Sequence, residues 1–170
     1  MTNHFSPLHI IFIITLCFLA GLFMAWGFQY IGGYEPCDLC YLQRWPYYGL
    51  ISIGALLLFS EKKLHFIDKY PRMLLSLFML IAIVSAGLGL YHAGVEWGFW
   101  QGPTSCSGGG GLNVNDIQFE MVLSDLETTR IVPCDKAAFR FLGLSFAGYN
   151  AVLSLCMAVY AALGLRCLKA

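Results

Sequence analysis

An apolar stretch from Leu8 to about Tyr30 contains no Asp, Glu, Lys or Arg, and it strongly constrains how the chain can fold. Roughly 20 apolar residues cross the hydrocarbon core of a bilayer as a helix. Further apolar stretches of about that length lie at residues 40–60, 73–95 and 142–165. With 58% hydrophobic and 12% charged residues, the chain is far more apolar than a soluble domain. We therefore predict an all-α integral membrane protein, a four-transmembrane-helix bundle forming a single domain over residues 1–170.

The charged residues outside these stretches predict the orientation of the bundle. The connection at residues 61–72 carries four basic residues, and the C-terminal tail adds Arg166 and Lys169. Because basic residues gather on the cytoplasmic side, both termini are expected there, with a short loop (about 31–39) and a long loop (about 96–141) outside. The first stretch lacks a basic leader and an Ala-x-Ala site, so we expect a retained helix. A formal net charge of +0 offers no basic surface for nucleic acid.

The seven cysteines fall into two groups on this topology. Cys37 and Cys40 form a Cys-x-x-Cys pair before the second stretch, and Cys106 and Cys134 lie in the long loop, so all four face the oxidising compartment. The remaining cysteines lie within or near the spans, where a cysteine usually acts as a small apolar residue; they are Cys17, Cys156 and Cys167.

The long loop contains two further features. A run of four glycines directly follows Cys106-Ser107 and would give that cysteine a mobile tether. Beyond it, Asn115-Asp116 could cap a short amphipathic helix on the bilayer surface, or the segment could be a loop with scattered apolar residues.

A Cys-x-x-Cys pair is usually a redox-active or a metal-binding unit. We therefore compare redox chemistry with two other uses of the four cysteines, a zinc site and structural disulfides. A zinc site of four thiolates usually draws its ligands from two close pairs, whereas Cys106 and Cys134 are far apart in the sequence. Purely structural disulfides are the second alternative. A disulfide between Cys37 and Cys40 would close a very small ring and remove little chain entropy, so stability is a poor reason for it. The pattern favours a redox-active pair and no metal site.

Three polar residues lie near this pair and are candidates for binding a ligand. A helix that begins near Cys40 places Arg44 one turn below on the same face, although Pro46 could kink the helix there. The Arg44 guanidinium could stabilise a thiolate and donate to a carbonyl oxygen, or it could snorkel to lipid headgroups. Gln43 could add a donor, and His92, near the outer end of the third stretch, could hydrogen-bond or protonate a ligand.

The order of these motifs resembles the disulfide bond formation protein B (DsbB) family over nearly the whole chain. Gln43 stands where a glutamate is frequent in that family. The matching segments are Pro36-Cys37-Asp38-Leu39-Cys40, Gln43-Arg44, Tyr91-His92-Ala93-Gly94-Val95-Glu96-Trp97, Thr104-Ser105-Cys106, Pro133-Cys134-Asp135 and Phe141-Leu142-Gly143-Leu144-Ser145.

The resemblance implies a multi-pass protein of the bacterial inner membrane that reoxidises DsbA, a periplasmic thioredoxin-fold protein, using ubiquinone or menaquinone. A DsbA thiolate would attack Cys106 of a Cys106–Cys134 disulfide, and Cys134 would attack Cys37 of a Cys37–Cys40 disulfide. Cys40 would then donate to the quinone, with Arg44, His92 and Gln43 as the quinone-binding candidates. The alternatives are a vitamin K epoxide reductase-like enzyme, in which the order of the cysteine pairs would differ, and a non-enzymatic membrane subunit with structural disulfides.

Overall fold

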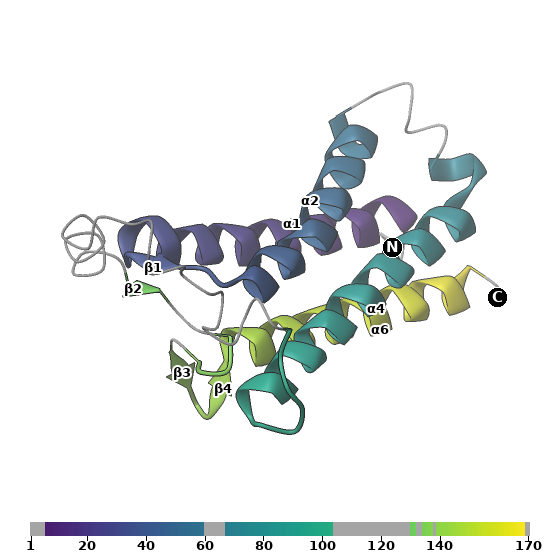
Figure 1. Cartoon of the computed structure of the whole chain (residues 1–170). Coiled ribbons are helices and arrows are strands. Elements are labelled where there is room, and N and C mark those ends of the chain that lie inside the picture. The colour runs from purple at the N-terminus through teal and green to yellow at the C-terminus, as the bar shows by residue number, and fades with distance from the viewer. Residues whose placement is uncertain (1–5, 60–66, 104–129, 132–133, 138, 169–170) are drawn as a thin grey trace.

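The structure of the protein is a computed structural model that describes residues 6–59, 67–103, 130–131, 134–137 and 139–168. The described chain is mostly helical (Figure 1). Ser6 caps the first helix by accepting a hydrogen bond from the backbone N–H of His9. The long helices are α1 (Pro7–Trp26), which continues into the π-helical turn η1 (Gly27–Ile31), α2 (Asp38–Phe59), α4 (Pro71–Glu96) and α6 (Phe146–Cys167).

Three of these helical segments are long and apolar enough to cross a membrane, namely Pro7–Ile31, α4 and α6. They correspond to the first, third and fourth predicted spans. The predicted second span forms α2, which is as long as α6 at 22 residues but is not among the three. Its first half carries Gln43, Arg44 and Pro46, which lower its hydropathy. A four-span bundle is therefore not established by the helices alone.

The start of α2 differs slightly from the expected start at Cys40. The helix begins at Asp38, and the backbone N–H of Tyr41 donates to the carbonyl oxygen of Cys37 at 3.0 Å. It continues without interruption through Pro46 to Phe59. Cys40 and Arg44 therefore lie on consecutive turns of one helix, as the sequence indicated.

The last helix begins at Phe146, a few residues after the expected start of the span at about residue 142. Strands β3 (Arg140–Phe141) and β4 (Leu144–Ser145) form an antiparallel hairpin there, turning at Leu142 (φ 50°) and Gly143 (φ 83°). Two consecutive residues with positive φ suit a tight hairpin turn and cannot belong to a right-handed helix. Only beyond this turn does α6 begin, with the Ser145 side chain accepting from the backbone N–H of Gly148.

A second strand pair joins segments that are far apart in the sequence. Strand β1 (Tyr34–Glu35) pairs in parallel with β2 (Arg130–Ile131). The described chain is therefore mostly helical, as predicted, with two short strand pairs that the sequence did not predict. The predicted surface helix after Asn115 and the residue Cys106 lie outside the described residues.

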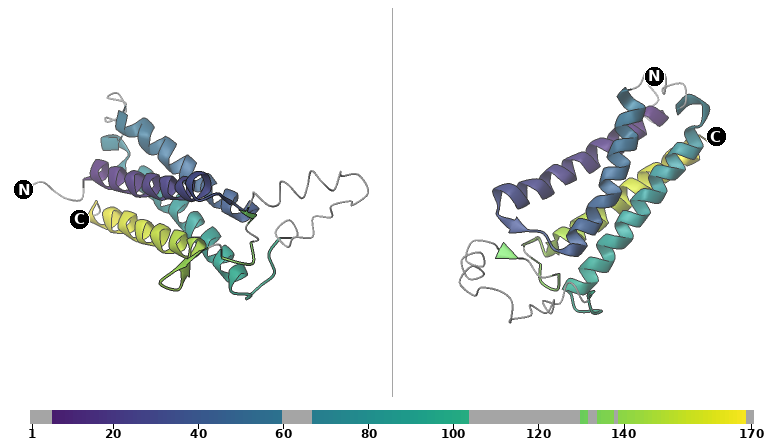
Figure 2. Two further views of the ribbon diagram at one scale, coloured as in Figure 1. Left: turned by 90° about the vertical axis from the view of Figure 1, so that its left-hand side faces the viewer. Right: turned by 45° about the horizontal axis from the view of Figure 1, so that its top comes forward.

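All four helices contribute side chains to one apolar core, including Phe18, Leu50, Phe78 and Ala161. Helices α4 and α6 lie side by side along their length (Figures 1 and 2). Gly89 permits this approach, because a Cβ there would lie 2.8 Å from the backbone nitrogen of Ala151. Small residues commonly allow such close packing of helices in membranes.

The chain termini and the strand pairs lie at opposite ends of the molecule. The start of α1 and the end of α6 lie at one end, and the strand pairs lie at the other (Figure 2). Arg72, at the start of α4, donates to the carbonyl oxygen of Leu168 at 2.9 Å. This contact brings Arg72 and the end of α6 together at the end opposite the strands.

Candidate redox site

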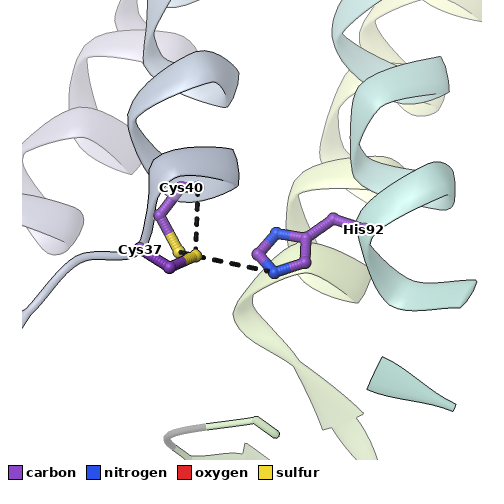
Figure 3. Close-up of side chains that lie close together, drawn as sticks. All are labelled: Cys37, Cys40 and His92. Atoms are coloured by element: carbon purple, nitrogen blue, oxygen red, sulfur yellow. Dashed lines mark hydrogen bonds between the residues drawn. The ribbon is translucent and has the colours of Figure 1, made fainter. Parts of the chain in front are cut away.

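Cys37 and Cys40 lie together at the start of α2 (Figure 3). Both are free thiols, and their Sγ atoms are 2.7 Å apart. The backbone N–H of Cys40 also donates to Cys37 Sγ at 3.2 Å. The first turn of a helix has unpaired N–H groups that stabilise negative charge, so the start of α2 favours a thiolate on Cys37.

Cys37 carries that charge in the reduced pair. Its pKa falls from 9.0 to about 5, chiefly because the Cys40 thiol donates a hydrogen bond to it. Burial opposes the shift, and a hydrogen bond with His92 adds to it. A thiolate is the nucleophilic form of cysteine, so the lowered pKa favours the form of Cys37 that takes part in thiol exchange.

His92 reaches the pair from α4, on the opposite side of the site (Figure 3). Its Nε2 atom is 3.8 Å from Cys37 Sγ and 3.9 Å from Glu96 Oε1. Its Nδ1 atom is 2.8 Å from Gln43 Nε2. The second carboxylate oxygen of Glu96, Oε2, is buried and has no hydrogen-bond partner among the described residues.

Arg44 is buried, with only 9% of its surface exposed. Its Nη1 atom donates to Gln29 Oε1 at 2.6 Å, and its guanidinium lies 5.3 Å from the centre of the Tyr41 ring. A snorkelling arginine would extend outward to solvent. Arg44 instead points into the protein, which favours the ligand-binding hypothesis.

One cavity of about 500 Å³ joins these groups. Cys37, Cys40 and Arg44 line it, together with Gln43 and His92. Its apolar wall includes Phe28, Phe139 and Phe146, and Cys17 also contributes to the lining. Phe28 and Phe146 meet edge to face with ring centres 4.4 Å apart. The site is therefore an apolar chamber with a thiol pair and a guanidinium on its wall.

A polar network that includes part of the chamber wall was not anticipated from the sequence. Gln43 Oε1 accepts from Asn150 Nδ2 at 2.9 Å, and Asn150 Oδ1 accepts from the Tyr47 hydroxyl at 2.8 Å. The hydroxyls of Ser85 and Ser154 also lie 3.2 and 3.1 Å from Asn150 Oδ1. Polar residues inside apolar stretches usually face the bundle interior, and Asn150 could have been flagged on that ground.

A family model described as disulfide bond formation protein DsbB matches residues 7–164. The chain belongs to the DsbB family. It is 31% identical over 148 residues to disulfide bond formation protein B of Marinobacter nauticus, covering 84% of this chain and 82% of that protein. It is 32% identical over 152 residues to the uncharacterized protein RP370 of Rickettsia prowazekii, with 87% and 81% covered. No solved structure matches significantly. Membership in the DsbB family supports a disulfide oxidoreductase that acts in disulfide bond formation.

Cys134 lies close to the thiol pair of this DsbB-family protein. It is disulfide-bonded, only 2% exposed, and clusters with Leu39 and Val95; Cys37 packs against that cluster. Cys106 lies outside the described residues. The fold thus brings together Cys37, Cys40 and Cys134, which are up to 97 positions apart in the sequence (134 minus 37).

The site also contains three atoms that could bind a metal ion. The two sulfurs and a His92 ring nitrogen all lie within 4.8 Å of one another, a donor set that suits zinc. The four-thiolate zinc site considered above would also need Cys134, which is disulfide-bonded and so is not a thiolate here.

Proposed function

We propose that this protein is a thiol:quinone oxidoreductase of the bacterial inner membrane. It reoxidises a periplasmic DsbA-like dithiol protein of the thioredoxin fold and passes the electrons to ubiquinone or menaquinone. The observation that carries the proposal is the shared cavity, in which a reactive thiol pair and a buried arginine line an apolar chamber.

The residues of the chamber fit a quinone. The aromatic side chains of Phe28, Phe139 and Phe146 offer a surface for a flat ring. Arg44 offers charged donors suited to a carbonyl oxygen, and its bond to Gln29 uses one of five N–H groups. A bound quinone would supply a two-electron, two-proton acceptor for the reduced cysteine pair.

The four cysteines act in the order Cys106, Cys134, Cys37, Cys40. Among the six cysteines that the structure describes, five are free and Cys134 is disulfide-bonded, which supports Cys106, the remaining cysteine of the sequence, as its partner. A partner thiolate attacks Cys106 and releases Cys134 as a thiolate. Cys134 then attacks Cys37 of an oxidised Cys37–Cys40 pair and releases Cys40. The second thiolate of the partner closes the partner's own disulfide and frees Cys106, and Cys106 attacks Cys134, which restores the Cys106–Cys134 disulfide and releases Cys37. The packing of Cys37 against the Cys134 cluster supports this direct transfer.

The charges of the released sulfurs are stabilised locally. Cys40, once released, lies one turn above the buried Arg44 and lines the same cavity. In the fully reduced pair, the charge rests on Cys37, where Cys40 and His92 stabilise it. Overall, the partner dithiol loses two electrons and two protons and becomes a disulfide. The quinone takes up the two electrons and the two protons.

The proposed topology is a single domain with four spans, α2 being the second, and both termini in the cytoplasm. The basic residue Arg72 contacts the end of α6, where Arg166 lies in the last turn, and this end of the molecule is opposite the strand pairs (Figure 2), which supports the orientation. Single cysteines introduced at Lys69 and Gln101 of a cysteine-free variant test the orientation. An impermeant label should reach only the second in intact cells, and labelling of only the first would refute the topology.

Two alternatives are less well supported. A vitamin K epoxide reductase-like enzyme would also couple Cys-x-x-Cys to a quinone, but the DsbB family match favours the proposal. A membrane subunit with structural disulfides would not need a free thiol pair with a stabilised thiolate, as at Cys37 and Cys40.

The direct test is oxidation of a reduced DsbA-like protein by the purified enzyme with a ubiquinone analogue. One quinone should be consumed for each disulfide formed. Oxidation at an unchanged rate without quinone, under anaerobic conditions, would refute quinone dependence. A protein that forms no disulfide in its substrate would refute the enzymatic proposal altogether.

A further inference from the structure

The side-chain amide of Gln43 forms hydrogen bonds at both its nitrogen and its oxygen, and its partners determine which end donates. Its Nε2 atom faces His92 Nδ1 at 2.8 Å and the carbonyl oxygen of Leu88 at 3.5 Å. A carbonyl oxygen can only accept a hydrogen bond. The Gln43 group that faces Leu88 and His92 is therefore its NH₂, which donates.

Asn150 supports the same orientation from the other side. Its Oδ1 atom lies within 3.2 Å of three hydroxyl groups, those of Tyr47, Ser85 and Ser154. Its Nδ2 atom donates to Gln43 Oε1. Reversing both amides would turn Gln43 Oε1 toward the Leu88 carbonyl oxygen and leave two acceptors face to face. The buried network therefore favours one arrangement of both amides.

We propose that Asn150 and Gln43 are positioning residues that fix His92 as the neutral tautomer with its proton on Nε2. A ring nitrogen that accepts from the Gln43 amide carries no proton, so Nδ1 is the acceptor and Nε2 the donor. The Nε2–H then faces Cys37 Sγ and the Glu96 carboxylate. This inference deepens the proposed function, since it assigns His92 the task of donating to the Cys37 thiolate.

The same geometry disfavours two other roles for His92. Protonation of Nδ1 would place a ring N–H against the Gln43 NH₂, two donors in contact. Metal binding through Nε2 would require that same Nδ1 proton. The hydrogen bonds from Asn150 through Gln43 thus keep His92 a neutral hydrogen-bond donor, although two thiols and an imidazole this close together could otherwise hold a metal ion such as zinc.

Nitrogen-15 NMR of labelled histidine in detergent-solubilised protein tests the proposal, with the His92 signal assigned by its loss in His92→Gln. At alkaline pH the wild type should show an unprotonated Nδ1 and a protonated Nε2. Gln43→Glu should move the proton to Nδ1, because an ionised carboxylate only accepts. The spectrum is recorded without quinone or partner, so its result is independent of the proposed enzymatic activity.

Gln29→Glu is the matched control, because Gln29 lines the same cavity and contacts Arg44 and Tyr41. It adds the same charge without a hydrogen bond to His92 and should leave the tautomer unchanged. Should Gln43→Glu fail to fold, Asn150→Asp removes the donor to Gln43 and should also populate the Nδ1–H form. A protonated Nδ1 in the wild type, or equal spectra in wild type and the folded Gln43 or Asn150 variant, would overturn the proposal.

Discussion

His92 Nε2 lies 3.8 Å from Cys37 Sγ and connects α4 to the start of α2. The contact joins a histidine near the end of one long helix to a cysteine 55 positions earlier in the chain. Together with the Cys40 thiol, it stabilises the Cys37 thiolate. The redox pair is therefore activated by a tertiary contact as well as by its position at a helix start.

The first prediction concerns the pH dependence of Cys37 in the reduced protein. Its alkylation rate, followed by mass spectrometry, should rise with pH through an inflection at about 5, the pKa of the thiol. Because this pKa is depressed from 9.0, the shift stabilises the folded reduced protein fully above about pH 9 and is lost as pH falls through about 5.

Two variants separate the causes of that shift. Cys40→Ala should move the inflection substantially upward, since the hydrogen bond from the Cys40 thiol is the largest cause of the shift, and His92→Leu, which removes a weaker donor, should move it less. An inflection that stays near its ordinary value in the wild type would contradict the structure of the pair.

The second prediction tests Arg44. Arg44→Lys replaces the planar guanidinium, which can donate to Gln29 and to a quinone oxygen at the same time. Losing the charge-assisted hydrogen bond to the quinone costs roughly 1.5–3 kcal/mol. Apparent quinone affinity should fall about tenfold to a hundredfold. The measurement is the quinone dependence of partner oxidation. Arg72→Lys, at the other end of the molecule, is the control and should leave it unaltered.

The third prediction separates the two cysteine pairs. Cys106→Ala should abolish oxidation of the DsbA-like partner but leave quinone reduction by a small dithiol, which can reach Cys37 and Cys40 directly. Cys40→Ser should abolish both activities. Equal loss of both in Cys106→Ala would contradict the proposed order of exchange.

The fourth prediction compares two glycines of α4, of which Gly89 packs against α6 and Gly87 does not. Gly89→Ala pushes a Cβ into the α6 backbone at Ala151 and should destabilise the protein by about 1–3 kcal/mol. Gly87→Ala meets no atom within 4 Å and should stabilise α4 by roughly 0.5–1 kcal/mol. Thermal unfolding in detergent measures both, and similar shifts would mean that α4 and α6 are not closely packed there.

Local sequence patterns predicted the parts of the site that depend on neighbouring residues. The length of the second apolar stretch predicted a helix start near Cys40, and helical spacing placed Arg44 one turn further on. The start of α6 was missed because the apolar run does not reveal a hairpin turn at Leu142-Gly143. Hydropathy reports composition, whereas that boundary depends on backbone conformation.

The residues missed by sequence reasoning depend on how the helices pack. Asn150 meets Gln43 across 107 positions, and Gln29 meets Arg44 from the turn that follows α1. Glu96 looked like one more charge of the outer loop, yet its side chain is buried beside His92. A single sequence shows that these residues are polar, but their partners are fixed only by the crossing of the helices.

The central claim is that the Cys37–Cys40 pair exchanges electrons with a quinone. The direct measurement is a count of free thiols, residue by residue, after the reduced protein is mixed anaerobically with a ubiquinone analogue. The account predicts that both thiols of the pair disappear as one quinone per pair is reduced, while the exposed Cys156 stays free. Thiols at Cys37 and Cys40 that persist in the presence of quinone would contradict it.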